Sequence, residues 1–302
     1  MKQIKNNFIF FGAVHQDFVF ELKNDLIKYR TNPIKQSESY GGVAHNVAKV
    51  ISNHEKVSFF SLMIDIESLQ YLKEQNIDFI SLSKKIEKRF YGILVNKFKK
   101  FQLGIANTEA YEKFDNKKLN LQFLNKNIVL DLNFSKEFIK KIVNKNYKTN
   151  NITVCGTSPF KVYKVKNIIK KINCLILNKE ELFALTKYRN INKSIKFITS
   201  INPYINLIVS NADKKTYGYE LSKLISCKPP KVKVVNENGA GDVMAGIYVY
   251  YKSKDHKLEN ALSLGVAAGV LHARNKIKKN LNYNSIKKVS NKVKIKKEKL
   301  NA

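Results

Sequence analysis

The chain has 302 residues, of which 44% are apolar, so it is long enough to bury a core and its composition does not indicate disorder. Its three cysteines, Cys155, Cys174 and Cys227, form no CxxC pair, which argues against disulfides and structural zinc and favours a reducing cytoplasm. The sequence contains no run approaching the roughly 18 apolar residues that a membrane-spanning helix needs.

The formal net charge of +31 could indicate a surface that binds nucleic acid. Arginine is the residue that most often makes specific phosphate and base contacts, yet the 55 basic residues include few arginines: Arg30, Arg89, Arg189 and Arg274. The lysines are spread through the chain among many Asn and Ile residues, which is typical of codon bias acting on a solvated surface. We therefore expect neither a nucleic-acid partner nor a membrane partner.

Short apolar runs alternate with longer segments of helical period, which predicts a mostly parallel sheet covered on both faces. The predicted strands are Phe8–Val14, Val57–Leu62, Ile128–Leu132, Ile152–Cys155, Cys174–Leu177 and Ile205–Val209. The predicted helices are Ala44–Ser52, Ser135–Lys145, Val162–Lys171 and Lys179–Lys187. Two stretches, Phe18–Tyr40 and Phe90–Ala106, have an extended or hairpin-like character and predict a small β lid over one end of the sheet.

No internal repeat or clear linker divides the chain, so we expect a single domain over 1–302. The two lid segments, at about 15–40 and 88–108, would be inserted into it. The final segment, 276–302, is lysine-rich and weakly periodic, and it predicts a surface helix with a frayed end.

The strongest local motif is Gly239-Ala240-Gly241-Asp242, followed by an apolar run that predicts a buried helix. Small residues leave the N–H groups at a helix N-terminus unobstructed, and such an N-terminus binds anions. Asp242 would lie in the first turn, where its carboxylate could accept the proton of an attacking hydroxyl. The alternative is an ordinary glycine-rich turn in which Asp242 caps the helix.

Three other polar clusters follow predicted strands or turns. Gly41-Gly42 could let a loop approach a ligand closely, with Asn46 in the first turns of the next helix, although a tight turn feeding a helix would also explain the glycines. Asp17 follows the first strand, and Asn178-Lys179-Glu180-Glu181 follows a later one. The carboxyl ends of the strands are where open α/β sheets bind ligands.

In this order and spacing, the four clusters resemble the motifs of the PfkB/ribokinase family of sugar and nucleoside kinases, over roughly residues 8–275. The resemblance implies a ribokinase-like, three-layer α/β/α fold with a mostly parallel central sheet and a small β lid. It also implies a phosphotransferase that uses ATP and Mg²⁺ to phosphorylate the primary hydroxyl of a sugar or nucleoside. The chain has no Walker A motif, which excludes a P-loop enzyme at the motif level.

The resemblance also implies roles for individual residues. Asp242 would be the catalytic base, beside an anion hole formed by Gly239, Ala240 and Gly241, while Asp17, Gly41, Gly42 and Asn46 would bind the acceptor, and Asn178, Glu181 and Ser210 would lie in the nucleotide and magnesium region. None of them would be a direct metal ligand, because the contacts to magnesium would run mainly through water.

Three segments depart from the family pattern. The nucleotide loop Thr-any-Gly-any-any-Gly appears as Ser210–Lys215 without either glycine, and Asn236-Glu237-Asn238 stands where Asp-Thr-Thr is usual. The Gly-Asp-Asp segment is shortened to Met63-Ile64-Asp65. A catalytically impaired, kinase-fold binding protein is therefore the alternative to an active enzyme, which the intact anion hole and base favour.

Two lid segments, Thr31-Asn32-Pro33 and Leu103–Tyr111, resemble those of bacterial pseudouridine kinases. This resemblance implies pseudouridine as the acceptor and pseudouridine 5′-phosphate as the product. Ribose and adenosine-type nucleosides are the alternatives within the family, and the lack of an arginine pair in the lid argues against a phosphosugar. The lid could also join two chains in a homodimer.

The altered segment at Asn236 predicts weak dependence on potassium. In the family a carboxylate at this position supports monovalent-cation binding, and a neutral amide attracts a cation far less. Turnover in sodium, potassium and tetramethylammonium salts should differ little at matched ionic strength, which must be matched because a surface this basic responds to screening alone. Several-fold activation specific to potassium would contradict the prediction.

Overall fold

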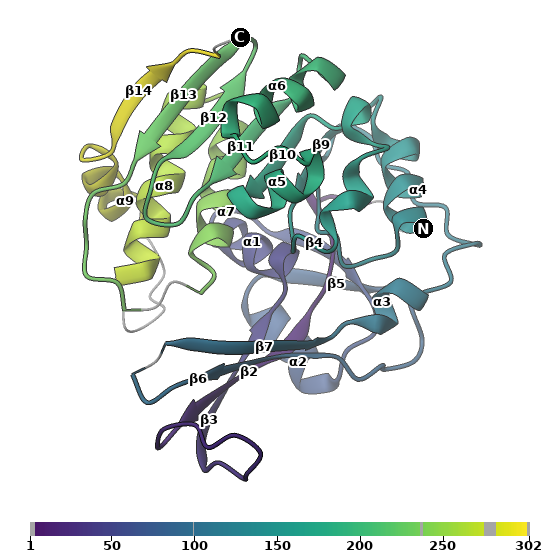
Figure 1. Ribbon diagram of the computed structural model, residues 1–302. Helices are drawn as coiled ribbons and strands as arrows, with labels where there is room; N and C mark the ends of the chain where they lie inside the picture. Colours follow the sequence, from purple (N-terminus) through teal and green to yellow (C-terminus); the bar gives the residue numbers. More distant parts are fainter. Residues whose placement is uncertain (1–3, 99, 236–237, 275–281, 301–302) are drawn as a thin grey trace.

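A computed structural model describes residues 4–98, 100–235, 238–274 and 282–300. Within these ranges, ten strands form one large sheet through the centre of the molecule (Figure 1). Their order across the sheet is β14-β13-β12-β11-β10-β9-β8-β1-β4-β5. The bounds are β1 Phe8–Phe11, β4 Val57–Ser61, β5 Ile77–Ser81, β8 Asn127–Leu130, β9 Asn151–Cys155, β10 Cys174–Asn178, β11 Asn206–Ser210, β12 Thr216–Glu220, β13 Lys223–Lys228 and β14 Lys294–Glu298.

From β5 across to β11, every neighbouring pair of strands is parallel, and β12, β13 and β14 extend the sheet in antiparallel fashion. A strand covered on both faces sends alternate side chains into two cores. Strand β1 does so, because Phe8 and Phe10 lie in one apolar cluster while Ile9 and Phe11 lie in the other. The six predicted strands and the mostly parallel sheet are confirmed.

Helices cover both faces of the large sheet, which confirms the three-layer architecture (Figure 1). One face is covered by α1 Val43–Ser52, α2 Ile66–Glu74, α7 Ala240–Lys252, α8 Leu258–Arg274 and α9 Tyr283–Ser290. The other is covered by α3 Glu109–Lys113, α4 Lys136–Asn146, α5 Lys179–Thr186 and α6 Ile191–Ile201.

A second, four-stranded sheet, here called the lid, projects away from the large sheet (Figure 1). Its order is β3-β2-β6-β7, with bounds β2 His15–Leu22, β3 Ile34–Gly41, β6 Phe90–Val95 and β7 Phe101–Asn107. Strands β2 and β6 are parallel, and the two outer pairs are antiparallel. Because β1 leads into β2 through residues 12–14, the lid is joined directly to the carboxyl end of β1.

One predicted helix was wrong, and a second predicted helix covers only part of its segment. Val162–Lys171 forms two short 3₁₀ segments, η1 Val162–Val165 and η2 Ile169–Lys171, rather than one α-helix. Its buried residues are Val162, Lys164, Val165, Ile168 and Ile169, a spacing that does not distinguish a 3₁₀-helix from an α-helix.

The lysine-rich segment 276–302 is not simply a surface helix. Helix α9 is followed by β14, which pairs with β13 at the edge of the sheet, and residues 276–281 lie outside the described ranges. The lysines of β14 mask the strand signal, but exposed lysines on an edge strand are a common protection against unwanted pairing.

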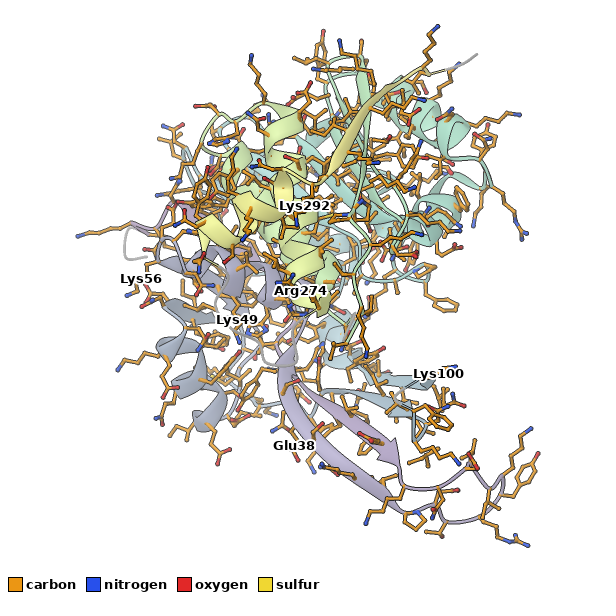
Figure 2. All side chains as sticks on the ribbon, turned by 90° about the vertical axis from the view of Figure 1, so that its left-hand side faces the viewer. Glu38, Lys49, Lys56, Lys100, Arg274 and Lys292 are labelled. Atoms are coloured by element: carbon orange, nitrogen blue, oxygen red, sulfur yellow. The ribbon has the colours of Figure 1, made fainter. Side chains whose placement is uncertain are left out.

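The excess positive charge is distributed widely over the surface. Figure 2 shows Lys56 beside the start of β4, Lys100 on the lid and Lys292 beyond α9, on well-separated parts of the molecule. This distribution favours a solvated surface over one basic binding face. Within the described ranges, no helix is both long and apolar enough to cross a membrane.

Candidate active site

The residues predicted to form the site lie where the parallel strands end and the next elements begin. Asp17 lies in β2 and Gly41 ends β3; Gly42 precedes α1, which carries Asn46; Asn178 ends β10 and Ser210 ends β11; Glu181 lies in α5; Gly239 precedes α7, which contains Ala240, Gly241 and Asp242. Because β1, β10 and β11 are parallel, their carboxyl ends lie on the same side of the molecule, which is here called the carboxyl edge of the sheet.

The N-terminus of α7 has no side-chain cap. Gly239 precedes it with φ 80° and ψ 0°, a left-handed conformation that glycine adopts without strain. Among the described residues, a Cβ added to Gly241 would meet no atom within 4 Å. The first N–H groups of a helix have no intrahelical partner, and they carry the positive end of its dipole. This helix start therefore offers a place for an anion.

Asp242 faces α1 from the first turn of α7. Asn46 donates a hydrogen bond from Nδ2 to Oδ2 of Asp242 over 2.7 Å. The two residues are 196 positions apart in the chain, and they join two motifs that the sequence presents separately. The amide of Asn46 thus holds one carboxylate oxygen of Asp242, while the carboxyl group itself stays beside the open helix start.

Burial raises the pKa of Asp242 from its ordinary value of 3.8 to about 7. The hydrogen bond from Asn46 acts in the opposite direction, and the negative charges of Glu181, Asp131 and Asp17 raise the pKa further. A carboxyl group with a pKa near neutrality can take up a proton during a reaction and release it afterwards.

The double glycine is required because a side chain at either position would collide with β2 or with the residues just before it. A Cβ on Gly41 would lie 2.1 Å from Oδ2 of Asp17, and one on Gly42, whose φ is 116°, would lie 2.0 Å from the carbonyl oxygen of Ala13. Asp17 is also close to His15, whose Nδ1 lies 2.8 Å from its Oδ1. Glycine at these positions therefore lets β3 approach Asp17 of β2, and lets the start of α1 approach the backbone of Ala13, independently of any ligand contact.

Asn178 and Glu181 form a capping box at the start of α5. Oδ1 of Asn178 accepts from the Glu181 N–H, and Oε2 of Glu181 accepts from the Asn178 N–H, both over 2.9 Å. Glu181 is buried, and burial raises its pKa to about 7, whereas the Asn178 N–H lowers it. Both side chains cap the start of α5, and Glu181 also adds negative charge near Asp242.

The turn after Ser210 keeps a left-handed backbone conformation although it contains no glycine. Ala212, which stands where the family loop has its first glycine, has φ 48°, in the left-handed region. A non-glycine residue in this region costs on the order of 1 kcal/mol. The substitution therefore does not abolish the backbone conformation, although it makes that conformation more costly.

Asp131 also lies at the carboxyl edge of the sheet, and the sequence motifs did not identify it. It follows β8 directly and is 1% exposed. Its Oδ2 accepts from the N–H groups of Ala13 (3.0 Å) and Ala44 (3.3 Å). The signal was available, because a polar residue directly after a short apolar run had already pointed to Asn178, but Asp131 was counted within the strand Ile128–Leu132.

Asn236 and Glu237 lie outside the described residues. Within the part of the chain that the structure describes, no group of three or more His, Cys, Asp or Glu side chains is arranged to hold a metal ion.

Comparison with known proteins assigns the family. The family model described as pfkB family carbohydrate kinase matches residues 10–277, which is most of the chain. The protein belongs to the pfkB carbohydrate kinase family. Comparison with curated protein sequences gave no match.

Solved structures of pfkB-type kinases share the fold. A carbohydrate kinase from Agrobacterium tumefaciens has a TM-score of 0.79 at 17% identity, covering 95% of this chain and 99% of that one. A Methanocaldococcus jannaschii nucleoside kinase of the ribokinase family gives 0.77 at 21% identity, with 95% and 99% covered. Ribokinase from Thermotoga maritima gives 0.79 at 16%, with 93% and 98% covered. The ribokinase-like fold is thereby confirmed.

Membership of the pfkB family makes this protein a phosphotransferase that acts on the hydroxyl of a sugar or nucleoside, with ATP as the donor. In-line phosphoryl transfer requires little covalent chemistry from the protein. The protein has two main tasks, which are to position the reacting groups and to neutralise charge. An open helix start beside a carboxyl group of near-neutral pKa suits both tasks.

The two glycines at the start of α7 should respond differently to alanine. Gly241→Ala adds a methyl group where no described atom lies, so thermal stability should be unchanged. The methyl group would occupy space left open for the anion, so binding of a non-hydrolysable ATP analogue with magnesium should weaken at least about tenfold, which corresponds to about 1.4 kcal/mol of binding free energy. Gly239→Ala forces φ 80° on alanine and should cost about 1 kcal/mol of stability. Calorimetry and thermal unfolding measure both, and full analogue affinity in Gly241→Ala would contradict an anion site here.

The raised pKa of Asp242 should make stability depend on pH. Because the folded-state pKa exceeds the unfolded value of 3.8, the stabilising contribution is fully present below 3.8 and is lost as the pH rises through about 7. Asp242→Asn removes that loss, so the variant should be more stable than the wild type at pH 8 by on the order of 1–3 kcal/mol, and the difference should vanish near pH 4. Urea unfolding across this range tests it, and a wild type as stable as the variant at pH 8 would refute it.

Proposed function

We propose that the protein transfers the γ-phosphoryl group of ATP to the primary hydroxyl of a sugar or nucleoside, with Asp242 as the general base. The observation that carries this proposal is the position of Asp242 in the first turn of α7, beside a helix start that is open at Gly241. A base must lie within hydrogen-bond reach of the hydroxyl that attacks the phosphoryl group bound at that helix start.

The acceptor would lie between the lid and the start of α1. The carboxylate of Asp17, the backbone of Gly41 and Gly42, and the amide of Asn46 supply donors and acceptors that suit sugar hydroxyls. Asn46 would have two tasks, because its Nδ2 already orients Asp242 while its Oδ1 can face a ligand. Asp242 would take the proton of the acceptor hydroxyl as that oxygen attacks phosphorus.

Charge that develops on the transferred phosphoryl group would be stabilised by the N–H groups of Gly239, Ala240 and Gly241, the anion hole expected from the family motif. The nucleotide would extend over the ends of β10 and β11, towards Asn178, Glu181 and Ser210. Magnesium bound to the nucleotide would neutralise phosphate charge, and the buried carboxyl group of Glu181 would help to hold its water ligands at this edge.

Pseudouridine is the acceptor that we favour. This preference rests on the lid segments Thr31-Asn32-Pro33 and Leu103–Tyr111, which resemble those of bacterial pseudouridine kinases. A cavity of about 310 Å³ beside His15 is lined in part by Phe18 and Phe90 but by none of the proposed acceptor-binding residues, so it does not bear on the choice of acceptor. The segment Thr31-Asn32-Pro33 shapes the lid, because the Asn32 side chain bonds both the N–H and the carbonyl of Ile27. Ribose and adenosine-type nucleosides are the alternatives.

An impaired enzyme that only binds its ligands is the main alternative to catalysis. Against it, Asp242 is held by Asn46, the helix start is open, and Ala212 keeps the left-handed turn of the nucleotide loop. A homodimer through the lid would be consistent with the exposed apolar side chains of Leu103 and Ile105 on β7. A cytoplasmic location stays a prediction from cysteine usage.

The proposed function is tested by product formation from ATP with ribose, pseudouridine, uridine, adenosine and fructose, each followed by mass spectrometry. We expect pseudouridine 5′-phosphate as the principal product. Asp242→Asn should lower kcat by about 10² to 10⁴, the usual scale for loss of a general base. The matched control is Asp115→Asn, the same change at an exposed loop residue, which should retain full turnover.

Two outcomes would count against the proposal. If Asp242→Asn turned over at the wild-type rate, Asp242 would not be the base. If the wild type bound the ATP analogue but phosphorylated none of the five acceptors, the binding-protein alternative would replace the proposed activity.

A further inference from the structure

The loop that follows β8 places a buried carboxylate at the junction between β1 and α1. Asp131 accepts at Oδ2 from the N–H groups of Ala13, just after β1, and Ala44, in the first turn of α1. Its other oxygen, Oδ1, accepts from the Asn133 N–H over 2.9 Å. One side chain thus joins three segments that are far apart in the sequence.

The junction is tightly packed, so its parts cannot shift independently. A Cβ on Gly12 would lie 2.4 Å from the Cβ of Ala44 and 2.5 Å from Oδ2 of Asp131. Real Cβ atoms do not come this close to other atoms, so glycine is needed at residue 12 for the carboxylate to reach both N–H groups. A displacement of Asp131 would therefore move the end of β1, the start of α1, or both.

The chemistry at this position requires a carboxylate. N–H donors arrive at both oxygens, and only an ionised carboxyl group accepts at both, whereas an asparagine would present an NH₂ group to one set of donors. Among the ion pairs of the described residues, none involves Asp131. Its charge meets backbone N–H dipoles and the nearby ammonium of Lys161, and its direct hydrogen bonds tie its position to the backbone it holds.

We propose that Asp131 is a positioning residue for phosphoryl transfer, which fixes the acceptor-binding segments on either side of the junction. Ala13 leads into β2, which carries Asp17, and Ala44 lies between Gly42 and Asn46. Through these two N–H groups, Asp131 sets where the acceptor lies relative to Asp242. The proposal rests on the proposed function and adds to it a residue that touches neither substrate.

Asp131 also acts on the base through its charge. The groups that shift the pKa of Asp242 come from four elements: Asn46 on α1, Glu181 on α5, Asp17 on β2 and Asp131 after β8. Burial is the largest cause of the raised pKa, and the charge of Asp131 adds to it. Removing that charge should lower the pKa of the base, in addition to loosening the acceptor site.

The first measurement is hydrogen exchange, which does not depend on activity. In Asp131→Ala, peptides that contain Ala13 and Ala44 should exchange at least about tenfold faster than in the wild type, because both N–H groups lose their acceptor. Peptides from β10 and α5 should be unchanged. Unchanged exchange at both Ala13 and Ala44 would overturn the anchoring role.

The second measurement is steady-state kinetics with pseudouridine and ATP, or with whichever acceptor of the panel is turned over. Asp131→Asn should lower kcat/KM for the acceptor by about 10²-fold, the scale of a displacement of about 1 Å, while KM for ATP stays within about twofold. The acid limb of the pH profile should move to lower pH. Equal losses for both substrates, or an unmoved acid limb, would overturn the positioning role.

Asn146→Asp is the matched control, since it exchanges an amide and a carboxylate at another buried, hydrogen-bonded position. Asn146 bonds to Leu121 and Phe123, near the amino end of β8, at the opposite edge of the sheet. This variant should lower thermal stability and leave exchange at Ala13 and Ala44, the acceptor KM and the acid limb unchanged. If it reproduced the kinetic changes of Asp131→Asn, those changes would be general effects of destabilisation and the proposal would fail.

A second variant covers the case in which Asp131→Asn does not fold. Asp131→Glu keeps the charge but displaces it, so acceptor KM should rise while the acid limb stays in place; unchanged acceptor KM would overturn the proposal. If the wild type phosphorylates no acceptor of the panel, the proposed function fails and the catalytic part of this proposal fails with it. Hydrogen exchange still decides the anchoring role separately.

Discussion

Helix α7 packs against α1 at a contact that leaves no room for a side chain. A Cβ on Gly246 would lie 2.7 Å from the Cβ of Val50 and 3.2 Å from the carbonyl oxygen of Val47. With glycine there, the two helices approach closely enough, one turn nearer their starts, for Asn46 to bond Asp242. The position of the proposed base therefore depends on this helix–helix contact as much as on the loop before α7.

The site combines carboxyl groups of raised pKa with an open helix start, in a chain of net charge +31. Asp242 and Glu181 both have pKa values raised to about 7, chiefly by burial, and Asp131 is buried beside them. Positive charge at this end of the strands comes from backbone N–H groups and from the side chains of Lys161 and Arg89, to which a cation bound with the nucleotide would add. The many surface lysines described here contribute mainly to the long-range attraction of an anionic substrate.

Local sequence patterns predicted the part of the fold in which one pattern dominates. The six predicted strands were short apolar runs buried on both faces, and the helices α1, α4 and α5 had a clear amphipathic period. Strand β14 was missed because its exposed lysines leave no apolar run, and β12 and β13 were also missed although β13 contains the short, mostly apolar run Leu224–Cys227. The segment Val162–Lys171 was assigned to the wrong helix type because spacings of three and of three-to-four residues are hard to tell apart over ten residues.

The site was predicted as separate clusters, and the contacts between them were not. Glycine-rich segments and polar residues after strands pointed to Asp17, Asn46 and Asp242, whose roles stay proposals. No local pattern could show that Asn46 bonds Asp242, or that Asp131 joins β1 to α1, because these contacts depend on the packing of distant segments. The capping box at Asn178 and Glu181 does have a sequence signature, Asn followed three residues later by Glu, but it was overlooked because both residues had been assigned to the nucleotide alone.

The stereochemistry of the transferred phosphoryl group tests the central claim, that Asp242 acts as a base for a single direct transfer at the start of α7. The measurement uses ATP made chiral at the γ-phosphorus with oxygen isotopes, and it determines the configuration of the phosphorylated product. A single in-line transfer from ATP to the acceptor hydroxyl predicts inversion of configuration. Retention would indicate two successive transfers through a phosphorylated residue, with Asp242 the obvious nucleophile, and would contradict the account.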